Sequence, residues 1–90
     1  MNPSHRAVYS AGNGEVEVYE IIIPELWNGK TVGDLLSSLK QCYPVALSRA
    51  GRASLPEMGT TLQTGDLLNV SSTFEGIGAL SALLTGKAEA

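Results

Sequence analysis

Cysteine and histidine are almost absent from this sequence, and their scarcity excludes several classes of site. The chain contains one cysteine, Cys42, and one histidine, His5. A lone cysteine can form neither an intramolecular disulfide nor a cysteine-based zinc site, and it fits a reducing, cytoplasmic compartment. His5 lies in a polar N-terminal segment, so no histidine is well placed to act as the base of a nucleophile–base pair.

Catalytic motifs are missing as well. The sequence contains no G-x-S-x-G, no Cys/His pair and no P-loop, so we expect no enzymatic activity. A metal site would have to rely on carboxylates alone. Glu15, Glu17 and Glu20 lie along one predicted strand and do not converge well, so we expect a solvated face there and no metal site.

Positive charge is scarce, and long apolar runs are absent. Six Lys and Arg residues stand against nine Asp and Glu, which gives a formal net charge of -3, and the basic residues form no cluster. This argues against nucleic acid as the main partner. The longest apolar stretch, 21–23, is far shorter than the roughly 20 residues of a membrane-spanning helix. Since residues 1–20 also lack the pattern of a signal peptide, we expect a cytoplasmic protein without direct membrane insertion.

The sequence does contain the composition of one small globular domain. Its 90 residues are 43% hydrophobic and 17% charged. A domain of this size buries a smaller share of its surface than a larger one, so it is only marginally stable alone. A second copy of the chain would relieve that marginality.

Turn-forming residues divide the chain into three parts. Residues 1–14 are rich in Pro, Ser, Gly and Asn, and they predict a flexible tail or linker with a weak strand signal at 6–9. Residues 15–85 carry the periodic patterns of the domain. Residues 86–90 are expected to be a frayed C-terminus.

Within the domain, the patterns predict four strands and two helices. The strands are expected at 15–23, 45–48, 52–55 and 67–71, with a tight turn at 50–51 joining the middle pair. Thr31 and Asp34 form a capping pair for a first helix that reaches 39 or 40. Ser72 or Thr73 caps a second helix that stops at Gly86. The expected fold is α+β, in the order strand, helix, strand, strand, strand, helix, with a mostly antiparallel four-stranded sheet.

Four short segments in this order resemble a known family. They are WNGKTVGDL at 27–35, PVALSRAG at 44–51, TLQTGDLLNV at 61–70 and TFEGIGAL at 73–80. The first is similar to a G-K-T/S-x-x-E/D-L step into a helix, and the third to T-x-L-x-x-G-D-x-L-x-V. Together they resemble the TrkA C-terminal domain, the C-terminal lobe of regulators of potassium conductance. The resemblance covers about residues 15 to 84.

The resemblance implies a cytoplasmic regulatory lobe of a potassium or other cation transport protein. Such lobes commonly pair as homodimers, and some bind a nucleotide or another small anionic ligand near the pair interface. They follow a Rossmann lobe or hang from the membrane subunit of a channel or transporter. No G-x-G-x-x-G with the context of a Rossmann lobe is present here. The alternative is a purely structural dimerisation module that binds no small molecule.

The resemblance also suggests where a ligand would bind. In relatives that bind a cyclic dinucleotide, the segments matching 38–44 and 54–57 supply polar groups. Here they contain neither arginine nor histidine, and Glu57 would repel a phosphate, so dinucleotide binding is disfavoured. Arg49 is either an anion contact or a solvated residue at a turn. The remaining candidates would line an apolar pocket: Val45, Ala46, Leu55 and Pro56.

Two features are candidates for a dimer interface. Ile21, Ile22 and Ile23 break the alternation of the first predicted strand, so they form either core or a surface that meets a second chain. Trp27 is either an anchor for a partner or a half-buried plug under the loop before the first helix.

Overall fold

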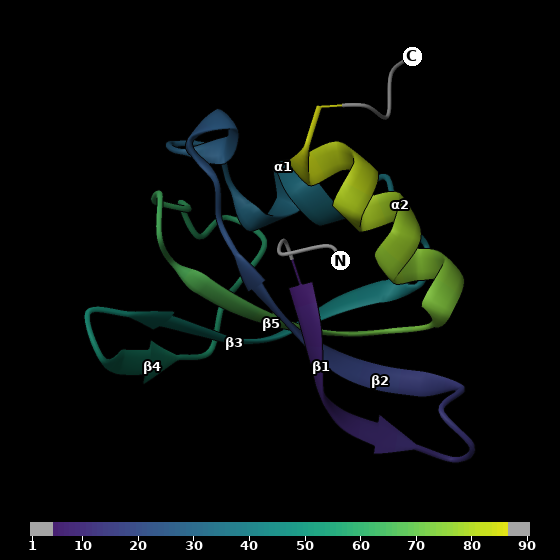
Figure 1. The fold of residues 1–90 in the computed structure, drawn as a ribbon. Helices are drawn as coiled ribbons and strands as arrows, with labels where there is room; N and C mark the ends of the chain where they lie inside the picture. The colour runs from purple at the N-terminus through teal and green to yellow at the C-terminus, as the bar shows by residue number, and fades with distance from the viewer. Residues whose placement is uncertain (1–4, 87–90) are drawn as a thin grey trace.

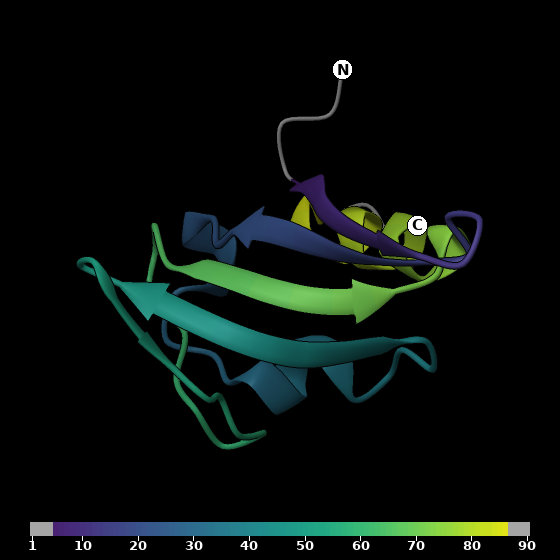
Figure 2. The ribbon, with the colours of Figure 1, turned by 90° about the horizontal axis from the view of Figure 1, so that it is seen from below.

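The chain folds as a five-stranded antiparallel sheet with two α-helices packed on one of its faces (Figure 1). The computed structural model describes residues 5–86. The sheet order is β1-β2-β5-β3-β4, and Figure 2 looks at the sheet from the side opposite the helices. The elements in chain order are β1 (His5–Ala11), β2 (Val16–Ile22), the 3₁₀ helix η1 (Glu25–Trp27), α1 (Val32–Leu36), β3 (Cys42–Arg49), β4 (Arg52–Ser54), β5 (Leu67–Ser72) and α2 (Phe74–Leu84).

The α+β class, the antiparallel pairing and the two helices are confirmed, but the prediction of four strands is wrong by one. The extra strand, β1, lies within 1–14, the segment predicted to be a tail or linker, so the order begins with two strands. β1 pairs antiparallel with β2, and the register shifts between Ala7 and Tyr9. Val8 is the extra residue of this bulge, which interrupts the two-residue alternation that identifies a strand in sequence. Of the predicted frayed end 86–90, residues 87–90 lie outside the described residues.

Both helices begin where the capping signals place them. At α1, the Thr31 hydroxyl accepts from the Asp34 amide and the Asp34 carboxylate accepts from the Thr31 amide, each at 3.0 Å. At α2, the cap is Thr73, whose hydroxyl oxygen accepts from the Gly76 amide at 3.0 Å. Ser72 remains in β5, so it does not form a capping box with Glu75. The first helix ends at Leu36, earlier than the predicted 39 or 40.

The connection from β4 to β5 lies against the start of α1 and completes its hydrogen bonding. The first amides of a helix lack partners within the helix. Here the Val32 amide donates to the Thr60 carbonyl at 2.9 Å, and the Gly33 amide donates to the Met58 carbonyl at 2.8 Å. The connection therefore positions α1 on the sheet.

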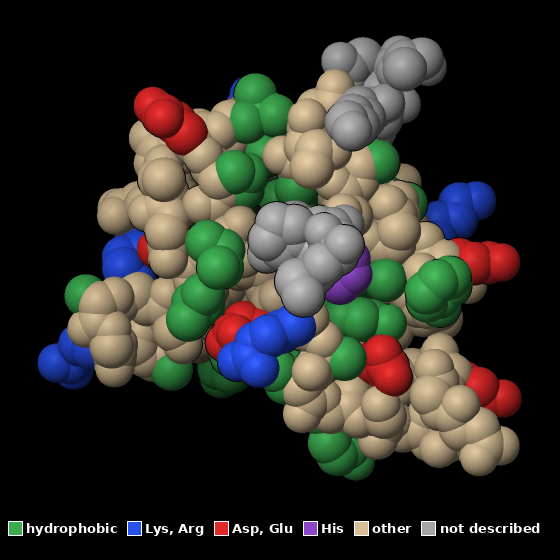
Figure 3. Space-filling model, viewed as in Figure 1, with side chains coloured by type: hydrophobic (Ala, Val, Ile, Leu, Met, Phe, Trp, Pro, Cys, Tyr) green, Lys and Arg blue, Asp and Glu red, His purple; other side chains and the backbone are tan. Residues whose placement is uncertain are grey.

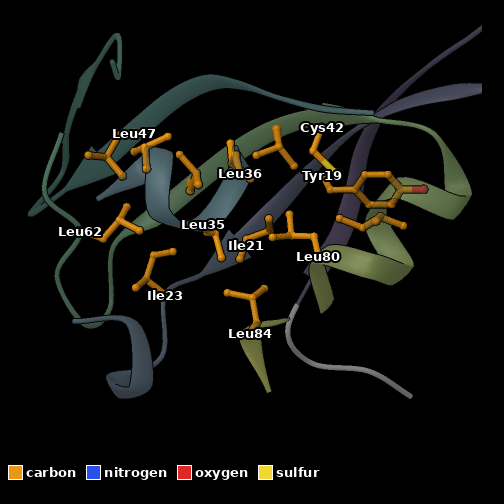
Figure 4. Packing of buried hydrophobic residues seen from close by; sticks show 14 residues of the cluster. Tyr19, Ile21, Ile23, Leu35, Leu36, Cys42, Leu47, Leu62, Leu80 and Leu84 are labelled. Carbon is orange, nitrogen blue, oxygen red and sulfur yellow. The ribbon is translucent and has the colours of Figure 1, made fainter. Parts of the chain in front are cut away.

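The hydrophobic core lies between the helices and one face of the sheet (Figure 4). Because side chains alternate along a strand, every second residue of β2 and β5 points into this layer. Ile21 pairs with Leu68, and Tyr19 pairs with Val70. The other buried hydrophobic residues are Ile23, Val32, Leu35, Leu36, Cys42, Leu47, Leu62, Ile77, Leu80 and Leu84.

Two glycines of α2 provide a matched pair for testing this packing. A Cβ at Gly76 would lie 2.9 Å from the Gln41 carbonyl oxygen and would overlap the Ser72 hydroxyl, whereas a Cβ at Gly78 would meet nothing within 4 Å. Gly78→Ala should stabilise the protein by about 0.5–1 kcal/mol through helix propensity. Gly76→Ala should destabilise it by about 1–2 kcal/mol, because overpacking outweighs the same gain.

Urea unfolding of both variants measures the difference in the free energy of unfolding. Equal stabilisation by the two alanines would show that Gly76 is not closely packed against β3 and β5.

Candidate functional site

Arg49, the predicted anion contact, is engaged by a carboxylate of the same chain. Its Nε donates to Asp66 Oδ1 at 2.8 Å, and its Nη2 donates to Asp66 Oδ2 at 2.7 Å. The same Nη2 donates to the Thr61 carbonyl at 2.9 Å. This two-pronged geometry is the strongest form of arginine–carboxylate pairing. An external anion would have to compete with Asp66 for the guanidinium.

Asp66 is the more deeply placed partner. Only 2% of it is exposed, and its Oδ2 also accepts from the Gln63 amide at 2.9 Å. The hydrogen bonds from the Arg49 side chain lower the pKa of the Asp66 carboxyl against the opposing effect of burial. The carboxylate therefore joins the end of β3, the connection before β5 and the first turn into β5.

The other predicted ligand residues do not surround the Arg49 guanidinium. Val45 is the extra residue of a bulge in β3 and is exposed, and Ala46 is half-buried next to it. Leu55 follows β4 and is 85% exposed, while Pro56 is half-buried. The structure thus separates the apolar candidates from the charged one.

The residues predicted for a dimer interface do not form one surface either. Ile21 and Ile23 are fully buried in the core of the single chain, whereas Ile22 points to the opposite side of the sheet and is 53% exposed. Trp27 is half-buried against the core, and its indole Nε1 donates to the Leu83 carbonyl at 3.0 Å. Of these four, Ile22 is the residue whose side chain is available to a partner.

The face of the sheet that carries no helix was not identified from the sequence. We call it the open face. Its residues alternate with the buried ones: Val18 pairs with Ser71 and Ile22 with Leu67, one step out of phase with the pairs that point into the core. The alternation of residues 16–22 in the sequence indicated that one face of β2 differs from the other. It did not indicate which residues of the neighbouring strands lie on the same face. The open face consists of Arg6, Tyr9, Ala11, Val16, Val18, Glu20, Ile22, Tyr43, Val45, Ala46, Ser48, Ala53, Leu67, Asn69 and Ser71.

Charge on the open face is confined to one pair. Arg6 Nη2 lies 2.9 Å from Glu20 Oε1, and these residues are opposite each other on β1 and β2. Figure 3, in the view of Figure 1, shows both acidic and basic side chains on the side of the molecule that it presents. Together with the apolar side chains of the open face, this arrangement is typical of a protein-contact surface.

A hollow lies at the end of the sheet where α2 begins. It has a volume of about 220 Å³ and is lined by Val16, Lys40, Gln41, Tyr43, Ser71, Ser72 and Thr73. A neighbouring, more open hollow of about 420 Å³ shares Lys40 and Gln41 with it and extends to Glu75. Both are formed in part by 38–43, the segment before and at the start of β3, and not by the predicted set around Val45 and Leu55.

Cys42 is packed behind this hollow. Its Sγ lies 3.4 Å from Ser72 Oγ and donates to the Gly76 carbonyl at 3.3 Å. Burial raises the pKa of the thiol, which lowers its thiolate fraction and its reactivity. Within residues 5–86, no group of three or more His, Cys, Asp or Glu residues could hold a metal ion.

No family model and no curated protein matches this chain. Over the part of the chain that the structure describes, no helix has the length and apolar character needed to cross a membrane.

The lowered pKa of the buried Asp66 carboxyl leads to a prediction about the stability of the protein in acid. Since the pKa of Asp66 is lower in the folded protein than in the unfolded chain, Asp66 stabilises the fold above the unfolded pKa of about 4. That contribution is lost as the pH falls through the folded pKa. Urea titrations between about pH 6 and pH 2 should therefore show the wild type losing about 1–2 kcal/mol more than Asp66→Asn.

Glu25→Gln, which removes an exposed carboxylate, is the control and should follow the wild-type curve. Parallel curves for the wild type and Asp66→Asn would show that Arg49 does not stabilise the ionised carboxylate.

Proposed function

We propose that this chain is a regulatory, ligand-sensing lobe of a potassium or other cation transport protein, and that it works as a homodimer on the cytoplasmic side of the membrane. The order strand, helix, strand, strand, strand, helix from Val16 to Leu84 agrees with the resemblance of the sequence to TrkA-type C-terminal lobes. β1 is an addition before that order.

The observation that carries the ligand-sensing part is the hollow beside α2. The Lys40 side chain borders it, and the first amides of α2 lack partners within the helix, so the positive end of a helix lies nearby. The hydroxyl group of Ser71 adds a polar contact, whereas that of Thr73 is already engaged, since it donates to Gln41 Oε1 and accepts from the Gly76 amide. This chemistry suits a small anion, and the volume suits a phosphate-sized group better than a whole nucleotide. A nucleotide would have to extend into the second hollow, where Glu75 opposes negative charge.

The mechanism would be linkage between ligand binding and lobe geometry. The hollow is bounded by the ends of β2, β3 and β5 and by the start of α2, which follows β5 after a single residue. A ligand that contacts all of them favours one arrangement of these ends. If the paired lobes differ in that arrangement between two states, the ligand shifts the equilibrium of the attached transporter by its difference in affinity.

A purely structural dimerisation module is the second candidate. It is favoured by the pairing of Arg49 with Asp66. Because its guanidinium is held by this carboxylate, Arg49, the predicted anion contact, is not free to bind a ligand. The uncharged character of the open face also fits a lobe whose role is to pair.

A thermal-shift screen separates the two candidates. Inorganic phosphate, ATP, a cyclic dinucleotide and K⁺ are each titrated against the protein. A ligand present at about 100 times its Kd stabilises the fold by about 2.7 kcal/mol, which raises Tm by several degrees. Lys40→Gln should lose most of the response to an anion, and Lys30→Gln, an exposed lysine beside Trp27, should keep it.

The absence of any shift with the wild type would favour the structural module. Equal responses from the two lysine variants would place the anion outside the hollow.

A further inference from the structure

The open face has the properties of a surface that is covered in the assembled protein. Both helices pack on the other face, so no helix covers this side of the sheet in the described residues (Figure 2). Tyr9 and Tyr43 are exposed on it, as are Val16, Ile22 and Val45. An antiparallel sheet that faces water on one side normally carries polar residues there. This sheet does so only in part.

From these observations we infer that a second copy of this chain docks on the open face, sheet against sheet. The inference rests on the proposed homodimer, and it names the residues that form the dimer interface. Ile22 is the one residue of the predicted interface that takes part; Ile21 and Ile23 do not, because they belong to the core of each copy.

Charge is the first argument for a second copy as the occupant. The only ionised side chains of the open face, Arg6 and Glu20, neutralise each other within the chain. In a two-fold dimer each patch meets itself, so any net charge on the patch would repel its own copy. A face without net charge avoids this, whereas a strongly charged partner would find no complementary groups on it.

Area is the second argument. The four long strands β1, β2, β5 and β3 lie about 4.8 Å apart and have about seven residues each at about 3.3 Å, so they cover roughly 19 by 23 Å, and the three-residue β4 brings the area to about 490 Å² per copy. Two copies would bury roughly 1,000 Å², which is in the range of weak, transient protein interfaces. Such an interface suits a lobe that is joined to a larger protein and pairs reversibly.

The shape of the open face also fits a copy of itself. Along β5 it carries Leu67, Asn69 and Ser71, which are all half-buried, and the last two are small or polar. The neighbouring strands carry the larger Ile22 on β2 and Tyr43 on β3. Two sheets pack about 10 Å apart with their side chains interdigitated. Large side chains of one copy can therefore lie over Asn69 and Ser71 on β5 of the other copy.

The edges of the sheet are less suited to pairing. β4 has only three residues, and β1 carries a bulge at Val8. Short edge strands and bulges are the usual means by which proteins prevent an edge from adding another strand. Of the surfaces of the sheet, the open face is therefore better suited to a second copy than either edge.

Light scattering during size-exclusion chromatography tests the inference on the whole chain. The wild type, loaded at roughly 100 µM, should elute with the mass of a dimer or of a dimer in exchange with monomer. Ile22→Lys and, as a second variant, Val16→Lys should each weaken dimerisation at least tenfold, because a charge is buried in the pair without a partner. Leu26→Lys is the matched control: Leu26 is 55% exposed, close to the 53% of Ile22, but lies in η1 on the helix side.

Each outcome decides the inference. A monomeric wild type overturns it, as does a dimer that survives both open-face variants or that dissociates with Leu26→Lys. A mixture of Ile22→Lys with Ile22→Glu should recover more dimer than either variant alone, provided that circular dichroism shows both variants folded. The ligand response in the thermal-shift screen is measured separately, so a monomer that still responds to an anion would contradict the open-face dimer and leave the ligand-sensing function standing.

Discussion

The buried carboxylate of Asp66 holds together the part of the chain with the least regular structure. Twelve residues separate the end of β4 from β5, and they contain no helix or strand of their own. Asp66 ties their C-terminal end to β3 through Arg49, while the Arg49 Nη2 atom also holds the Thr61 carbonyl. Once the connection is held there, its carbonyls at 58 and 60 meet the first amides of α1. The position of the first helix on the sheet therefore depends on an ion pair that lies outside the core.

The same arrangement explains why the two faces of the sheet differ. The two helices and the connection are all on one side, where they bury Ile21, Leu68 and Val70. Residues 5–86 leave no element for the other side. A chain of this size could not form a second layer without more helices, because its secondary structure is already committed to the first. The exposed side chains of the open face follow from this one-sided construction.

Local signals in the sequence were sufficient for most of the elements. The capping pair at Thr31 and Asp34 and the turn at 50–51 act over a few residues, and their geometry is as expected from those residue types. Long-range pairing was not accessible in this way. Arg49 and Asp66 are 17 residues apart, and nothing local marks them as partners. Ile21, Ile22 and Ile23 are chemically identical, so only their register against β5 decides which of them face the core. At β1, a bulge hides the alternation from the sequence.

The hollow and the open face share residues, and this has a consequence for regulation. Val16, Tyr43 and Ser71 line the hollow and also belong to the open face. A second copy docked on that face would lie at the rim of the hollow, so the surroundings of a bound anion would differ between monomer and dimer. By reciprocity, an anion that binds the paired lobes more tightly strengthens the pairing by the same factor. Such coupling would need no change in the core: the sheet carries both surfaces, and a bound anion would act on the proposed dimer through the ends of β2, β3 and β5.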